Sequence, residues 1–208
     1  MSADRMHFDA ESHTYRLDGK VLDSVTTILK RLSREAYRFV DRSVMERAAA
    51  LGTAVHKLIE LDIAGTLDEE SLHPELVPYL HSWRRFRATS GFRPILSEQI
   101  VWSERYQYAG QLDLLGELHD FIAVVDAKRC AQVPITAGPQ TAGYEIAARE
   151  RHPEIFIKGK AVKRFALQLN TDGTHRLVPF TDPDDARVFL SELTSRNFLK
   201  KHKLLSED

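Results

Sequence analysis

The middle of the chain is patterned as short strands. Apolar, β-branched and aromatic residues fill 95–103, 108–118 and 121–128, and polar turn residues separate these segments. Near the N-terminus, apolar and polar residues alternate over 13–22, on both sides of Asp18-Gly19. A similar pair of segments, 161–170 and 174–180, is joined through Asp172-Gly173. Both dipeptides suit the positive φ values of tight hairpin turns. The pattern predicts three adjacent strands, with one β-hairpin before them and one after.

Helical periodicity fills most of the remaining chain. Apolar residues recur at three- and four-residue steps over 41–63, and further helices are expected over 72–88, 137–151 and 183–199. A short helix is expected after Asp23 or Ser24, and the last helix after Thr181 or Asp182, because these side chains can cap a helix N-terminus. The predicted fold class is therefore α/β, with a central mixed sheet flanked by helices.

Composition narrows the function classes without choosing one. The 208 residues include 29 Lys and Arg against 30 Asp and Glu, so net charge gives no argument for a nucleic-acid partner. No apolar run is long enough to cross a bilayer, and the first residues are too polar for a signal peptide. We expect a soluble, cytoplasmic protein with no membrane partner. The single cysteine, Cys130, excludes a disulfide framework, and we expect it to be incidental.

Two charges end an otherwise apolar strand at 121–128. Asp126 and Lys128 share one strand face with Ile122 and Val124, whereas Val125 and Ala127 face the opposite, helix-covered side. An exposed salt bridge at the end of a strand would explain Asp126 and Lys128 as well as a functional site does.

Asp113 favours the functional interpretation. It lies among apolar neighbours in the preceding strand, and the turn at 118–120 brings it beside Asp126. Two carboxylates in an apolar setting repel each other unless a cation or a shared proton compensates. Carboxylates on a rigid hairpin suit Mg²⁺ or Mn²⁺, which complete their coordination with water and substrate phosphate.

Four motifs together resemble a known nuclease family. Gly110-x-x-Asp113 followed by Asp126-x-Lys128 resembles the core motif of the PD-(D/E)XK nuclease superfamily, with Leu112 in place of proline and Asp126 in place of glutamate. The segment GTAVHKLIE, 52–60, resembles the RecB-type helix that presents a metal-binding histidine, and QTAGY, 140–144, is similar to the Gln-x-x-x-Tyr motif of that branch. The segment 13–29 resembles phage-encoded exonucleases and, more remotely, mitochondrial genome maintenance exonucleases.

The resemblance covers 13–150 and implies one nuclease domain over 1–208, with a restriction-endonuclease-like core. Within it, 1–40 form the N-terminal hairpin and helix, 41–93 a helical segment, and 94–208 the catalytic core.

The resemblance also implies roles for individual residues. His56, Asp113, Asp126 and the Ala127 carbonyl would hold Mg²⁺ or Mn²⁺, one or two ions in all, without an iron-sulfur cluster. Glu98, which is expected on one face of its strand together with Leu96 and Ile100, would lie near the first ion or near a second. Glu104 is a weaker candidate for this role. Lys128 would orient or deprotonate the attacking water. Gln140 and Tyr144 would contact the DNA backbone or steady Lys128.

The activity implied is a metal-dependent DNA exonuclease that leaves 5′-phosphates. We expect a role in phage recombination or DNA processing beside a single-strand annealing protein, in the host cytoplasm if the chain is phage-encoded. A structure-specific or nicking endonuclease would use the same site. A DNA-end-binding or regulatory protein on an inactive nuclease fold is the non-enzyme alternative. A sugar hydrolase also pairs two acids but leaves Lys128 and the Gln-Tyr helix unexplained.

DNA contacts are expected to be made to the backbone without sequence specificity, because no base-reading element is present in the sequence. The basic candidates, each of which also fits a solvated surface, are Arg84, Arg85, Arg87, Lys158, Lys160, Lys163, Arg164 and the segment 199–203. Trp102, Tyr106 and Tyr108 fit either base stacking or packing.

Overall fold

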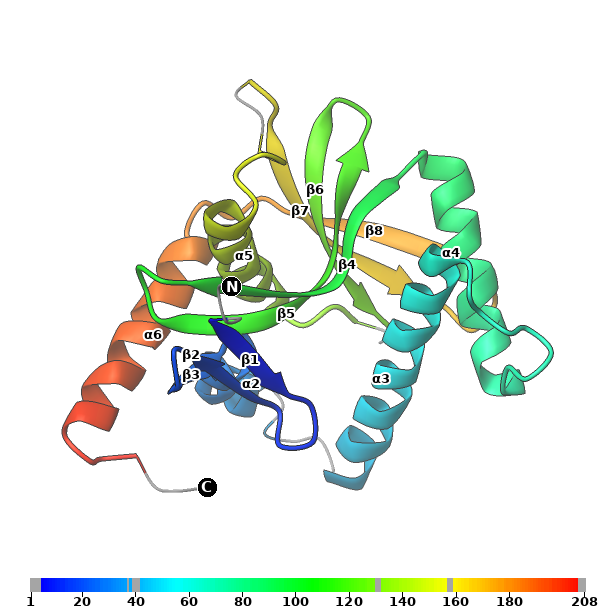
Figure 1. Ribbon diagram of the computed structural model, residues 1–208. Helices are drawn as coiled ribbons and strands as arrows, with labels where there is room; N and C mark the ends of the chain where they lie inside the picture. The colour runs from blue at the N-terminus through cyan, green and yellow to red at the C-terminus, as the bar shows by residue number, and fades with distance from the viewer. Residues whose placement is uncertain (1–4, 37, 39–41, 130–131, 157–158, 206–208) are drawn as a thin grey trace.

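An eight-stranded mixed sheet organises the protein (Figure 1). The computed structural model describes residues 5–36, 38, 42–129, 132–156 and 159–205. Its sheet order is β1-β2-β3-β5-β6-β7-β8, with β4 paired to β5. The strands are β1 Met6–Asp9, β2 Thr14–Leu17, β3 Lys20–Ser24, β4 Arg93–Ser103, β5 Tyr108–Leu118, β6 Phe121–Lys128, β7 Val162–Leu169 and β8 His175–Phe180.

The sheet forks along one edge of β5. On its other edge β5 pairs with β4 over nearly its whole length. On the forked edge, β3 runs beside Tyr108 and Ala109, and β6 runs beside 114–118. Because β3 is parallel to β5 and β6 is antiparallel to it, the C-terminal ends of β3 and β6 approach each other, leaving 110–113 between them. Open sheets place ligand crevices outside the carboxyl ends of their strands, so this gap is a candidate site.

Helices cover both faces of the sheet. Helices α3 and α4 pack on one face, and α1, α5 and α6 pack on the other (Figure 1). The helices are α1 Val25–Ile28, α2 Lys30–Ala36, α3 Arg42–Ala64, a 3₁₀ turn Pro74–Leu76, α4 Val77–Ser90, α5 Ala137–Arg151 and α6 Asp185–Lys201. None of these helices is long and apolar enough to cross a membrane within the part of the chain that the structure describes.

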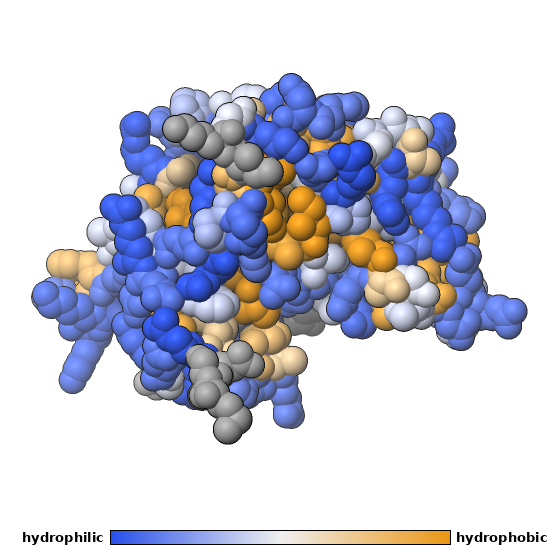
Figure 2. Space-filling view, turned by 45° about the horizontal axis from the view of Figure 1, so that its top comes forward, coloured by the Kyte–Doolittle hydropathy of each residue, from blue (hydrophilic) through white to orange (hydrophobic). Residues whose placement is uncertain are grey.

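Two large apolar clusters hold these layers together. Trp83 and Phe86 of α4 pack with Leu114 and Val125 on one face, and Phe189 of α6 packs with the cluster on the other. Figure 2 shows a face on which hydrophilic residues cover most of the surface and hydrophobic residues show mainly in the middle. This distribution is expected of helices that turn their apolar sides toward a sheet.

The predicted α/β fold with a mixed sheet is confirmed, and so are its elements from 93 to 180. The N-terminal hairpin is confirmed by its turn, where Asp18 and Gly19 both have positive φ values of 48° and 81°. The start of the last helix was predicted wrongly, because the Asp182 carboxylate accepts the Asp184 N–H and holds a turn ahead of α6. Strand β1 and helix α2 were not predicted.

Ile122 and Val124 face one side of the sheet and Val125 and Ala127 the other, as predicted. The side of Val125 and Ala127 is covered by α3 and α4, as expected, and the opposite side is covered by α1, α5 and α6.

Candidate functional site

Three carboxylates lie in a row across β4, β5 and β6. Glu98 falls between the paired residues Ser97–Leu114 and Gln99–Leu112, so it lies opposite Asp113. Asp113 directly precedes Leu114, which pairs with Val125, so Asp126 follows on the next strand. The Ala127 N–H donates to Asp113 Oδ2 at 2.8 Å and joins the last two strands at this level. Side chains paired across antiparallel strands share a face, so the register gathers the three acids.

Glu98 takes its place through an unusual backbone. Its φ of 49° lies in the left-handed region, which non-glycine residues adopt rarely and at a cost of about 1–3 kcal/mol. The kink breaks the alternation of β4, because Leu96 packs with the α5 side of the sheet whereas Ile100 packs with the N-terminal hairpin. The expectation that Glu98 shares a face with Leu96 and Ile100 was therefore wrong. Gln111 holds the side chain by donating to Glu98 Oε2 at 2.9 Å.

His56 reaches this row of acids from α3. Its Nδ1 lies 3.0 Å from Glu98 Oε1 and 3.6 Å from Asp113 Oδ1. Val55, Leu58 and Ile59 anchor the same turns of α3 in the apolar cluster below the sheet. Because residues three and four apart share a helix face, this anchoring fixes the direction of the neighbouring His56 side chain.

Lys128 and two residues of α5 surround Asp126. Lys128 Nζ lies 2.7 Å from Asp126 Oδ2, and Gln140 Nε2 donates to Asp126 Oδ1 at 3.2 Å. Gln140 also donates to the Tyr144 hydroxyl oxygen at 3.3 Å, as expected for residues one helical turn apart. The sequence prediction that Gln140 and Tyr144 share a helix face is confirmed, and the contact of Gln140 is with Asp126.

Gly110 allows α5 to approach β5. A Cβ atom at this position would lie 2.7 Å from Tyr144 Cε1, closer than real Cβ atoms come, and 3.1 Å from Val25 Cγ2, which is a tight contact. Gly52 is different, because a Cβ there would meet nothing within 4 Å. Gly52 therefore does not serve to bring α3 close to the sheet.

The row of acids carries more negative charge than its surroundings compensate. Burial by itself lowers the pKa of His56, but Asp113 and Glu98 outweigh that effect and raise it to about 9. Burial raises the pKa of Asp113 above its usual range. Burial also raises the pKa of Asp126 to about 6, although the Lys128 ammonium opposes the shift. All three directions mean that the site favours additional positive charge.

The donor atoms fit a divalent cation. His56, Glu98 and Asp113 each offer one ligand atom, and these atoms lie within 4.8 Å of one another. One imidazole nitrogen with two carboxylate oxygens is a set that several divalent ions accept, so the donors alone select no particular ion. Glu98, expected beside the ion, belongs to this closest set, whereas Asp126 is engaged by Lys128 and Gln140. Ala127 contributes its N–H to Asp113, and a role for its carbonyl stays a prediction.

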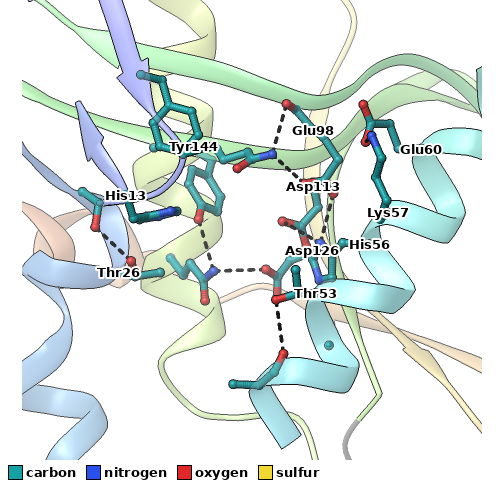
Figure 3. Close-up of a pocket in the computed structure, with 18 of the residues that line it drawn as sticks. His13, Thr26, Thr53, His56, Lys57, Glu60, Glu98, Asp113, Asp126 and Tyr144 are labelled. Atoms are coloured by element: carbon teal, nitrogen blue, oxygen red, sulfur yellow. Dashed lines mark hydrogen bonds and ion pairs between the residues drawn. The ribbon is translucent and has the colours of Figure 1, made fainter. Parts of the chain in front are cut away.

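A cleft of about 690 Å³ contains all these side chains. Figure 3 shows Thr53, His56, Lys57 and Glu60 on α3 along one wall, His13 and Thr26 along the other, and the acids between them. The sequence interpretation missed the second wall, which also includes Phe8 and Tyr15. The available signal was a cluster of aromatic residues and histidines in the segment 7–15, directly before a predicted hairpin.

The predicted basic contacts lie away from this cleft. Arg84 pairs with Asp62 and Glu69, and Arg85 lies on the same helix, α4, in the field of Asp172. Neither arginine lines the cleft, and their expected contact with the DNA backbone stays a prediction. Five more of the predicted cations have partners of their own: Arg87 with Asp62, Lys160 with Glu117, Lys163 with the Phe121 ring, Arg164 with Asp185, and Lys200 with Asp23.

The aromatic candidates divide between core and surface. Tyr108 is fully buried and donates its hydroxyl to the Gly143 carbonyl, so packing explains it and base stacking is excluded in this conformation. Arg151 covers the Trp102 ring at 4.3 Å, and Arg105 lies over Tyr106. Glu104 binds Arg5 and Arg151 outside the cleft. Cys130 and Lys158 lie outside the described residues.

No family model matches the chain, and no curated protein matches it.

Proposed function

We propose that this protein is a metal-dependent deoxyribonuclease of the PD-(D/E)XK type that acts as an exonuclease on DNA ends. The observation that carries the proposal is the row of Glu98, Asp113 and Asp126, with His56 above it and Lys128 beside it. These residue types in this order are also the ones on which the sequence resembles RecB-type nucleases.

Hydrolysis of a phosphodiester needs a water aligned with the scissile bond and compensation of the charge that grows on the phosphoryl oxygens. A divalent cation such as Mg²⁺ or Mn²⁺, when bound, would supply a Lewis acid and lower the pKa of that water. His56, Glu98 and Asp113 are the residues that would hold it, and Asp126 lies on the neighbouring strand within electrostatic range of Asp113.

Lys128 is the residue proposed to act on the water. Its ammonium is held at Asp126 Oδ2, at the end of β6 and within the cleft. From there it orients the water or the phosphoryl oxygen and stabilises developing negative charge. Gln140 keeps the Asp126 carboxylate turned toward Lys128, and its amide also donates to the Tyr144 hydroxyl oxygen.

The test is digestion of end-labelled linear DNA and covalently closed circular DNA with Mg²⁺, Mn²⁺ or EDTA. We expect metal-dependent loss of linear DNA, release of 5′-phosphorylated products and intact circles. Lys128→Ala should lower the rate about 10²- to 10⁴-fold, the usual contribution of a positioned proton-transfer group. Lys20→Ala, which removes an exposed lysine bound to Gln107, is the matched control and should cleave normally.

Each other outcome selects a different function. Cutting of circles would make the protein an endonuclease with the same site. DNA binding without metal-dependent cleavage would overturn the catalytic proposal and leave a DNA-end-binding protein. The exonuclease proposal includes a single-strand annealing protein as partner. Co-purification of such a protein with this one on labelled DNA ends would test that part of the proposal.

A further inference from the structure

Three aromatic rings from the N-terminal strands contact one another beside the candidate metal centre. Phe8 stacks on Tyr15 with ring centroids 4.7 Å apart and planes 27° from parallel. His13 meets both rings edge-on, at 5.2 Å from Phe8 and 5.4 Å from Tyr15. We refer to Phe8, His13 and Tyr15 as the aromatic shelf.

The backbone holds this shelf in a fixed shape. Phe8 and Tyr15 are directly paired across β1 and β2. The turn between the strands is closed by Asp9 Oδ1, which accepts the N–H groups of Glu11 and Ser12. His13 lies in this turn with a φ of 50°, in the left-handed region, and its ring packs against the rings of both strands. A preformed aromatic surface loses little conformational entropy when a planar ligand stacks on it.

The shelf lines the same cleft as the acids. Phe8, His13 and Tyr15 form the wall opposite α3, and Figure 3 shows the His13 ring directed into the space between that wall and His56. Tyr15 is buried, and the Glu98 carboxylate adds to the burial that raises its pKa to about 12, so the shelf is within the electrostatic range of the row of acids. His13 is exposed and Phe8 half-buried, so these two rings are the part that a ligand in the cleft can reach.

The charges of the cleft argue against a grip based on phosphates alone. Its described lining includes two lysines and no arginine. Lys57 Nζ is held at 2.7 Å by Glu60, and Lys128 is held at 2.7 Å by Asp126. Duplex DNA is gripped mainly by cations on its phosphates, whereas unpaired strands are held largely by bases stacked on aromatic side chains.

We propose that Phe8 and His13 form a stacking site for an unpaired nucleobase next to the scissile phosphate. This inference rests on the proposed nuclease function and deepens it, because it makes DNA with a single-stranded terminus the preferred substrate class.

The direct test uses a single-stranded oligonucleotide with the fluorescent base 2-aminopurine at its terminal nucleotide, in EDTA so that no cleavage occurs. Stacking on the shelf should change its emission. Phe8→Leu keeps an apolar side chain, and His13→Asn keeps a residue that tolerates positive φ, so both variants remove a ring with little disturbance of the hairpin. The double variant should lose the emission change and raise Kd about 10-fold or more, whereas Phe8→Trp should restore the stacking lost in Phe8→Leu. Equal emission changes in wild type and the double variant would overturn the stacking site.

A second readout separates this inference from the proposed function. On cleavage assays the double variant should raise KM for single-stranded ends about 10-fold and leave kcat within about twofold. If the double variant cleaved single-stranded ends with the KM of the wild type, the stacking site would be overturned and the nuclease proposal would stand. A lack of cleavage by the wild type, together with a ring-dependent change in emission, would overturn the nuclease and support a single-strand-binding cleft.

Discussion

His56 Nδ1 lies 3.0 Å from Glu98 Oε1, although 42 positions separate the two residues in the chain. This contact joins α3 to the kink in β4, and Gln111 on β5 supports it from the other side of the carboxylate. The proposed metal centre is therefore a joint between α3 and the sheet. Residues that orient ligands in this manner normally influence metal affinity nearly as much as the ligands do.

Metal should stabilise the protein through this joint. A ligand that binds only the folded state at 100 times its Kd raises the free energy of unfolding by about 2.7 kcal/mol. We expect Mn²⁺ to raise the unfolding temperature of the wild type relative to EDTA, and Glu98→Gln to lose most of that rise. Glu104→Gln alters an exposed glutamate that binds Arg5 and Arg151, and this variant should keep the rise in unfolding temperature. Equal shifts of the unfolding temperature in Glu98→Gln and Glu104→Gln would show that Glu98 does not bind the metal.

Two glycine substitutions should have opposite effects. Gly110→Ala forces a Cβ to 2.7 Å from Tyr144 Cε1, so we expect a loss of about 1–3 kcal/mol in urea unfolding together with reduced cleavage. Gly52→Ala, in the interior of α3 with open space around it, should gain about 0.5–1 kcal/mol because alanine is the better helix former. A destabilised Gly52→Ala protein would show that α3 packs more closely than described.

Removal of the Gln140 amide should change the pH dependence of cleavage. Gln140→Ala takes one hydrogen-bond donor from Asp126 Oδ1. Because that donor favours the ionised carboxylate, its loss should raise the pKa of Asp126 and move the acidic limb of the pH–rate profile upward. Tyr144→Phe keeps the donor and should leave the limb in place while costing about 1 kcal/mol of stability. An unmoved limb in both variants would mean that Asp126 does not control it.

Glu117 should contribute to stability only above acidic pH. Hydrogen bonds from Arg93 and Lys160 lower the pKa of Glu117 to about 2. A pKa that is lower in the folded state means that the contribution is complete above the unfolded value near 4.5 and is lost as pH falls toward 2. The difference in urea midpoint between wild type and Glu117→Gln should therefore narrow between pH 5 and pH 3. It should also shrink in 1 M salt, because the pair is exposed. A constant difference would contradict this account.

The elements of the fold were predictable because their hydrophobic periods are regular. Strands β4, β5 and β6 and helix α5 follow the strand and helix periods closely, and the acids of β5 and β6 interrupt otherwise apolar strands. Asp113 and Asp126 could be placed side by side from the length of the turn alone. The common helix face of Gln140 and Tyr144 followed from their spacing of one helical turn, whereas the contact of Gln140 with Asp126 was not predicted.

Other features depend on contacts that no local pattern encodes. The direction of Glu98 follows from a single left-handed residue, which breaks the alternation on which the prediction relied. The wall formed by Phe8 and His13 depends on β3 pairing with β5, a parallel contact between distant segments. Arg84 could not be placed because a cluster of arginines has the same sequence whether it faces DNA or, as here, binds Asp62 and Glu69.

The fork in the sheet also sets when the site can form during synthesis. Strand β3 leaves the ribosome early, yet its place beside Tyr108 and Ala109 exists only after β5 has emerged, and the facing strand β6 follows later still. Closing such a long loop is entropically costly and slow compared with forming local hairpins. The N-terminal wall of the cleft can therefore meet the carboxylates only after the centre of the chain has emerged, however early its own local hairpins form.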